Sequence, residues 1–204
     1  MTGRRSPARF PAFALRAAEA YIRGIERRIE AGLNPTVESV ASLFISRWDV
    51  AVANKVPGGL KGRLGIAVAG KAYKSYLDFL ASPRWQRAYN FGARAQRLLW
   101  ASTGTKDPLL PDTFYVKSLA VPFTVNTMPD VTLKAFGDHG IVNEAIVFDQ
   151  SSIEDVMQQF VKAGIDVDAL GLELQNEGAK SFVKSWVELM NVISAKGNQL
   201  LQPK

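Results

Sequence analysis

The stretch RLLWASTGTKDP, Arg97 to Pro108, decides the fold that we expect for this chain. Its residues Leu98 to Ser102 suit a buried strand, and they run directly into a turn of small, hydroxyl-bearing residues. The side chains of Ser102, Thr103 and Thr105 can each donate an O–H group to an anion, Gly104 lets backbone N–H groups approach it, and Lys106 adds a positive charge. The pattern predicts a strand followed directly by a phosphate-binding loop.

An ordinary strand-to-loop turn is the alternative interpretation of this stretch. In such a turn, Ser, Thr and Gly side chains and backbone groups satisfy only one another. The stretch is not a P-loop, because that motif needs a glycine directly before the lysine, and Thr105 precedes Lys106.

Two further short apolar runs predict strands, VASLFI at 40–45 and FTVNT at 123–127. Apolar residues at three- and four-residue steps predict helices between and before them. The expected helices cover about 13–31, a stretch opening at Arg47, Leu64 to Leu80, a short helix capped by Ser82 and Pro83, and short pieces near 115–119 and 131–136. Alternating strands and helices imply an α/β fold with right-handed parallel crossovers.

Helices alone are expected in the C-terminal part. The first covers Ser151 to Ala163 and begins with a capping box of Ser151 or Ser152 with Glu154 or Asp155. The last covers Ala179 to Ile193, and residues 197–204 are expected to fray. The sequence thus divides into a loose arm at 1–13, a β/α region at 14–140 and a helical segment at 141–204 that packs on it.

Composition narrows the functional class. The chain has 204 residues, of which 47% are apolar and 22% charged, and it has no cysteine. These values are typical of a soluble protein, no apolar run reaches the ~20 residues of a membrane helix, and no signal core follows the N-terminal arginines. No disulfide, thiolate metal site or membrane partner is expected, and a cytoplasmic location is predicted.

The net charge of +6 is unevenly distributed, with every arginine at or before Arg97. A basic half can indicate nucleic-acid binding. Here, however, the arginines alternate with glutamates along predicted helix faces, and no nucleic-acid-binding motif accompanies them. We therefore expect no nucleic-acid partner.

Three segments resemble transaldolase, specifically the longer bacterial type that is sometimes fused to a glucose-6-phosphate isomerase. They are SVASLFISRWD at 39–49, QRLLWASTGTKDP at 96–108 and TVNTMPDVTLKAFGDHG at 124–140. The resemblance implies an incomplete TIM (β/α)8 barrel, about the last three strands plus C-terminal helices. A whole barrel needs eight strands and usually ~250 residues.

The resemblance also implies an activity. The family transfers a dihydroxyacetone unit from sedoheptulose 7-phosphate to glyceraldehyde 3-phosphate in the pentose phosphate pathway. It uses a Schiff-base lysine and needs no cofactor or metal. A lysine can form this imine only when its amine is neutral, which requires a desolvated pocket or a neighbouring cation.

Site residues follow from the resemblance by position. Ser42 and Arg47 match the family's serine and arginine at the end of the sixth strand, and Ser102 matches the serine after the seventh. Lys106 is our candidate for a charge that an arginine supplies in shorter members, and Thr105 completes the expected phosphate site. The alternative for Arg47 is a helix-end arginine paired with Asp49.

The family's catalytic residues are expected upstream of this chain, which therefore carries none in the prediction. The matching region is preceded only by MTGRRSPARFPAF, which contains no lysine. The hydroxyl groups around Lys106 favour its charged form and argue against it as the imine-forming residue. His139 is interpreted as a surface residue, and all four tryptophans (Trp48, Trp85, Trp100 and Trp186) as core residues.

Three hypotheses remain open at this point. The chain is a transaldolase portion that is inactive alone, a non-catalytic module that binds a sugar phosphate, or a chain that completes a barrel with a partner or a second copy. Unpaired strand edges of a partial barrel favour such association.

Overall fold

The computed structural model describes residues 12–142 and 146–201, so most of the predicted arm at 1–13 lies outside the described residues. The elements in chain order are α1 (Ala12–Glu30), β1 (Ser39–Phe44), α2 (Ile45–Val52), η1 (Gly58–Leu60), α3 (Leu64–Leu80), α4 (Pro83–Asn90), β2 (Gln96–Ala101), α5 (Phe114–Ser118), β3 (Thr124–Asn126), α6 (Asp130–His139), α7 (Gln150–Lys162) and α8 (Val167–Leu201).

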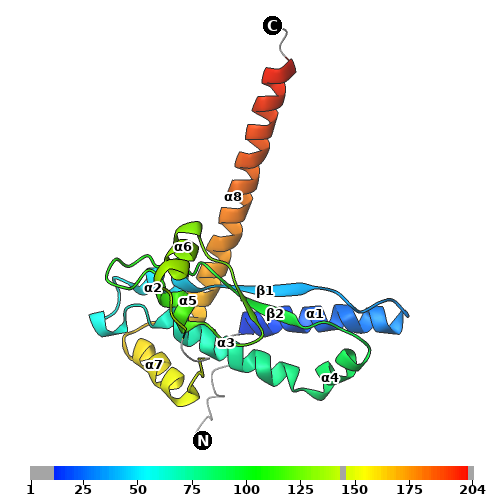
Figure 1. The fold of residues 1–204 in the computed structure, drawn as a ribbon, viewed down its shortest axis with the longest axis horizontal. Helices are drawn as coiled ribbons and strands as arrows, with labels where there is room; N and C mark the ends of the chain where they lie inside the picture. The colour runs from blue at the N-terminus through cyan, green and yellow to red at the C-terminus, as the bar shows by residue number, and fades with distance from the viewer. Residues whose placement is uncertain (1–11, 143–145, 202–204) are drawn as a thin grey trace, which may run out of the picture. The chain divides into compact units, whose positions relative to one another are not determined.

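The three described strands form one parallel sheet in the order β1-β2-β3. This confirms the predicted α/β class and its parallel crossovers. Phe44 lies opposite Ala101, and Trp100 lies opposite Asn126, so the carboxyl ends of the strands are nearly level. Figure 1 shows α2, α5 and α6 gathered at this end of the sheet.

The two faces of the sheet are covered unequally. Residues that pair in a parallel ladder share a face, and successive residues alternate between faces. Leu43 and Trp100 pair and are both buried, whereas the neighbouring row contains exposed Ser42 beside half-buried Leu99 and Val125. Apolar packing therefore holds one face, and the other is more open.

Helix α1 packs beside β1 and against α3 and α4 (Figure 1). Its apolar stripe places Ile22 and Ile25 in a buried cluster with Trp85 of α4. On the polar side, Arg84 donates to Glu26 and Glu19 at 2.6 Å. Glu19 and Glu26, two of the glutamates that alternate with arginines along α1, thus join α1 to α4.

Two predicted helix starts have different outcomes. Ser82 caps α4 as expected, since its hydroxyl accepts from the Trp85 amide and Pro83 is the first helical residue. The predicted cap of α7 is wrong. Asp149 is the cap, and its carboxylate accepts from the amides of Ser151 and Ser152 because a carboxylate has more acceptor sites than a serine hydroxyl.

The described residues from Ala12 to Ile165 form one compact unit, in which α7 contacts α3, and Asp166 begins a second unit that contains α8. The prediction of a last helix at 179–193 was too short, because α8 continues through Gly171, Gly178 and Gly197 to Leu201. The core prediction for Trp186 is wrong, since its side chain is 62% exposed. The division at residue 140 stays a prediction.

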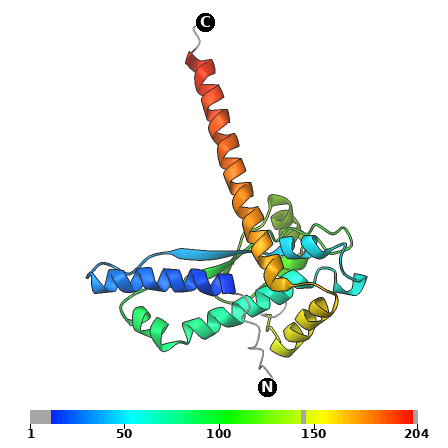
Figure 2. The same ribbon diagram turned by 180° about the vertical axis from the view of Figure 1, so that it is seen from behind.

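Figure 2 shows the same ribbon from behind. None of the helices that the structure describes combines the length and hydropathy of a membrane span.

Candidate functional site

Hydroxyl groups join the ends of β1 and β2. The oxygen atoms Oγ of Ser46 and Ser102 lie 2.8 Å apart, and the Ser46 amide donates to the Ser102 carbonyl at 3.1 Å. Ser46 follows β1 by two residues, and Ser102 directly follows β2. Because parallel strands bring their carboxyl ends to one edge, residues 56 positions apart meet here.

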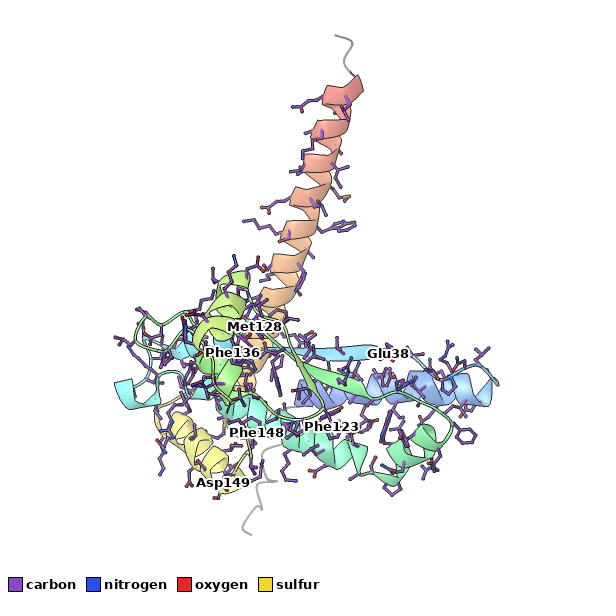
Figure 3. All side chains as sticks on the ribbon, viewed as in Figure 1. Glu38, Phe123, Met128, Phe136, Phe148 and Asp149 are labelled. Atoms are coloured by element: carbon purple, nitrogen blue, oxygen red, sulfur yellow. The ribbon has the colours of Figure 1, made fainter. Side chains whose placement is uncertain are left out.

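A second pair of bonds joins the ends of β2 and β3. The fully buried hydroxyl of Thr103 lies within 2.8 Å of Asn126 Oδ1 and 3.1 Å of the Thr127 carbonyl. The Thr127 amide donates back to the Trp100 carbonyl at 2.9 Å. All three strand ends are therefore held at one polar edge, which Met128 marks in Figure 3, whereas Glu38 marks the amino side of β1.

The backbone of Ser102 is in the left-handed region, with φ of 57°. This conformation costs a residue that has a Cβ roughly 1–2 kcal/mol. Such conformations persist where surrounding contacts fix them and are frequent at functional sites. The bonds to Ser46 are the contacts that hold Ser102 here, and they set the direction of its hydroxyl.

Arg47 is in the first turn of α2, next to Ser46. Its guanidinium carbon lies 4.4 Å from the centre of the Phe44 ring, a cation–π contact. Among the described residues, Arg47 has no hydrogen-bond or ion-pair partner, and the alternative pairing with Asp49 is wrong, since that carboxylate bonds elsewhere. The fork of donors is therefore available to an anion.

The remaining predicted residues are placed differently. Ser42 lies inside β1, two residues before its end, with its side chain on the open face. Thr105 donates its hydroxyl to the Pro111 carbonyl at 2.8 Å, so in this conformation it stabilises its own loop. Lys106 is exposed and has no ion-pair or hydrogen-bond partner among residues 12–142 and 146–201.

Gly104 has a packing role. It is buried, and a Cβ at this position would lie 3.1 Å from Cγ of Pro129 and 3.4 Å from the Thr132 hydroxyl oxygen. The glycine lets the loop after β2 approach the start of α6 closely. That approach keeps the loop at the edge of the sheet.

Below this edge is a buried carboxylate, Asp49, which is only 8% exposed. It accepts from the amides of Leu64 and Gly65 at 2.9 and 3.2 Å, and from the Tyr115 hydroxyl at 2.9 Å. Burial raises the pKa of Asp49, and these three donors oppose that rise. Burial, together with the Asp49 charge, raises the pKa of Tyr115, which keeps its proton and donates.

His139, the only histidine, links α6 to the end of the loop after β2. Its Nε2 lies 3.0 Å from Asp112, and its Nδ1 lies 3.2 Å from Asp138. The carboxylate of Asp112, more than that of Asp138, raises the pKa of His139, and the histidine lowers the pKa of Asp112. The predicted surface position of His139 is confirmed.

The chemistry of the edge comes from hydroxyl groups and from Arg47. Within the described ranges, no three side chains of the metal-binding types cluster. No described lysine is buried, and the half-buried Lys71 lies 3.1 Å from Glu154. Two hydroxyl groups are held together at the edge, and Arg47 follows Ser46 in the first turn of α2.

Three residues of this region, Ser46, Asn126 and Tyr115, were not singled out from the sequence, and Asp49 was named only as an alternative partner for Arg47. Ser46 and Asn126 could have been found, because each lies where a predicted strand ends. Asp49 and Tyr115 gave no local signal, since they meet across 66 positions of the chain.

Comparison with known proteins identifies the family of this chain. Residues 11–193 match the family described as Transaldolase/Fructose-6-phosphate aldolase. The chain is 41% identical over 177 residues to a transaldolase of Neisseria meningitidis serogroup C, and 42% identical over 184 residues to one of Acidothermus cellulolyticus. A transaldolase of Thermobifida fusca is 39% identical over 185 residues.

Each of these alignments covers 86% of this chain and 50% of the relative. The chain thus spans about half the length of the curated relatives that it matches. The strand-end segments that form the polar edge lie inside the matched region. The chain belongs to the transaldolase/fructose-6-phosphate aldolase family.

Proposed function

We propose that this chain supplies the phosphate-binding part of a transaldolase. In the proposed reaction a dihydroxyacetone unit passes from sedoheptulose 7-phosphate to glyceraldehyde 3-phosphate, as part of the pentose phosphate pathway. The observation that carries this proposal is the polar edge, where the Ser46 and Ser102 hydroxyls lie 2.8 Å apart beside Arg47, whose guanidinium has no acceptor among the described residues.

In this proposal Arg47 holds the substrate phosphate. Its planar fork can donate two parallel hydrogen bonds to a phosphate, and stacking on Phe44 restricts the side chain before the ligand arrives. Ser102 adds a hydroxyl, and Lys106 adds a mobile point charge from the loop. We assign Ser42 and Thr105 to the same site, where Thr105 contributes by holding the loop at Pro111.

The imine-forming lysine and the acid–base carboxylates belong, in our proposal, to residues outside this chain. Imine formation requires a neutral amine to attack the ketose carbonyl, after which the carbinolamine loses water. A lysine amine in solvent is ordinarily protonated at neutral pH. The exposure of every described lysine except half-buried Lys71 supports this assignment.

We infer that the three-stranded sheet is part of a TIM barrel. Phosphate sites in such barrels form at loops after the seventh and eighth strands, which agrees with the loop after β2. In the described sheet β1 and β3 each pair on one side only, so two edges can accept further strands. We propose that a complementing segment, a partner chain or a second copy pairs there, in the cytoplasm.

Borohydride trapping tests the proposal that the imine-forming lysine is not in this chain. The chain is incubated with fructose 6-phosphate, reduced with borohydride and digested, and lysine peptides are examined by mass for the three-carbon adduct. We expect no adduct on this chain alone. An adduct on any of its lysines, Lys106 included, would overturn the proposal that the reactive amine is elsewhere.

A non-catalytic sugar-phosphate-binding protein is the second candidate, favoured by the same absence of a buried lysine among the described residues. Sedimentation at several micromolar concentrations, with and without added fructose 6-phosphate, separates the two. The partial-barrel proposal expects association through the strand edges. A folded, cooperative monomer that binds the sugar phosphate favours the second candidate.

A further inference from the structure

The short helix α2 has two functional sides. Arg47 and Asp49 are two residues apart, which places them about 200° apart around an α-helix. Arg47 contacts Phe44 near the polar edge, and Asp49 is buried on the opposite side. Any contact that fixes Asp49 therefore also fixes where Arg47 is presented.

Asp49 is fixed by two different elements. The amides of Leu64 and Gly65 belong to the first turn of α3, and the Tyr115 hydroxyl belongs to α5. There is little room for another arrangement, because a Cβ at Gly65 would lie 2.7 Å from Asp49 Oδ2 and 2.7 Å from the Ile45 carbonyl oxygen. The carboxylate thus has one close-packed position.

Helix α5 in turn supports the loop that carries Lys106. The loop closes on itself where Thr105 donates to Pro111, three residues before α5 begins at Phe114. It leaves β2 at Ser102, so it is anchored at one end by the strand and at the other by α5. The Tyr115 hydroxyl donates a side-chain hydrogen bond that joins α5 to Asp49 of α2.

We propose that Asp49 and Tyr115 are positioning residues for phosphate binding, whose hydrogen bond holds the helix that carries Arg47 against the segment that carries Lys106. This inference rests on the proposed function of the polar edge. It differs from a role in capping α3, because the cap uses the two backbone amides and needs no tyrosine.

Tyr115→Phe separates these roles. It keeps the ring and both amide bonds to Asp49, and it removes only the bond between α5 and α2. Tyr76→Phe is the matched control, because the buried Tyr76 hydroxyl in α3 has no hydrogen-bond partner among the described residues. Both variants are compared with the unaltered full chain, well below their melting temperatures.

Two readouts are measured. Hydrogen exchange without ligand is expected to rise about fivefold or more in both α2 and residues 103–113 of Tyr115→Phe, and to stay unchanged in Tyr76→Phe. The affinity for fructose 6-phosphate, followed by ³¹P NMR, is expected to fall about fivefold in Tyr115→Phe alone.

The outcomes separate the inference from the proposed function. Faster exchange in both segments, with no binding even by the unaltered chain, supports the role of the Tyr115 hydrogen bond in holding α2 and α5 together and refutes the proposed function. Exchange that changes only inside α5, or equally in both variants, overturns the inference. Unchanged affinity in Tyr115→Phe, when the unaltered chain binds, also overturns it.

Discussion

Because the backbone of Ser102 is left-handed, we expect glycine to be more stabilising than alanine at this position, the reverse of the usual order. Ser102→Ala removes the hydroxyl that bonds to Ser46 and keeps a Cβ at a φ of 57°. Ser102→Gly removes the same hydroxyl and also the Cβ. Since glycine adopts positive φ without steric cost, we expect Ser102→Gly to be more stable than Ser102→Ala by about 1 kcal/mol.

Ser46 offers the matched control, because it loses the same hydrogen bond from a helical position. In α2 the order reverses, and Ser46→Ala should be more stable than Ser46→Gly by about 0.5–1 kcal/mol. The double variant Ser46→Ala, Ser102→Ala should show a coupling free energy of about 0.5–1.5 kcal/mol. The pair of serines thus separates backbone strain from hydrogen bonding.

Urea unfolding followed by tryptophan fluorescence measures these differences, because Trp48, Trp85 and Trp100 are buried in the first unit. A Ser102→Gly variant that is no more stable than Ser102→Ala would show that the left-handed backbone carries no cost at this position. The same order of stability at both positions would show that backbone conformation does not distinguish them.

Three further predictions concern single contacts. The pKa of His139 is raised, so its ion pair with Asp112 stabilises the fold in full below the ordinary histidine pKa, and this stabilisation is lost as pH rises through the raised value. NMR titration of this sole histidine should show a lower pKa in Asp112→Asn, and an unchanged pKa contradicts the assignment. Gly65→Ala should destabilise the fold by about 1–3 kcal/mol, because its Cβ would lie 2.7 Å from oxygen atoms. Gly24→Ala has open space around the new Cβ and should stabilise the fold by about 0.5–1 kcal/mol in the same urea assay. Equal effects of the two substitutions contradict the packing argument. Asp149→Ala should lower the free energy of unfolding by about 1 kcal/mol through loss of the α7 cap, and no change would show that the cap is dispensable.

Local patterns predicted the elements of the first unit well. Apolar spacing gave α3 its observed ends, Leu64 and Leu80, and the short apolar run around Trp100 gave β2. These signals are strong because one face of each element is buried in a fixed period. The predicted carboxyl ends of the strands, residues 45, 102 and 127, each lie one residue beyond the observed ends, so Ser102 follows β2 instead of closing it.

Longer-range features were not predictable in the same way. Asp49 and Tyr115 meet only because the fold brings α2 and α5 together, and no pattern within either segment indicates the other. The left-handed conformation of Ser102 was equally hidden, since serine rarely adopts it. The length of α8 was underestimated because Gly171 and Gly178 each cost about 1 kcal/mol relative to alanine in a helix, a cost that a long helix tolerates.

Phosphate binding through Arg47 at the carboxyl edge of the sheet is what the proposed function requires. A ³¹P NMR titration of fructose 6-phosphate tests it most directly, with Arg47→Ala compared with Arg97→Ala, which removes an exposed arginine near the amino end of β2. We predict saturable binding that Arg47→Ala weakens about tenfold or more and Arg97→Ala leaves unchanged. Binding that Arg47→Ala leaves intact, or that both variants weaken equally, would contradict the account.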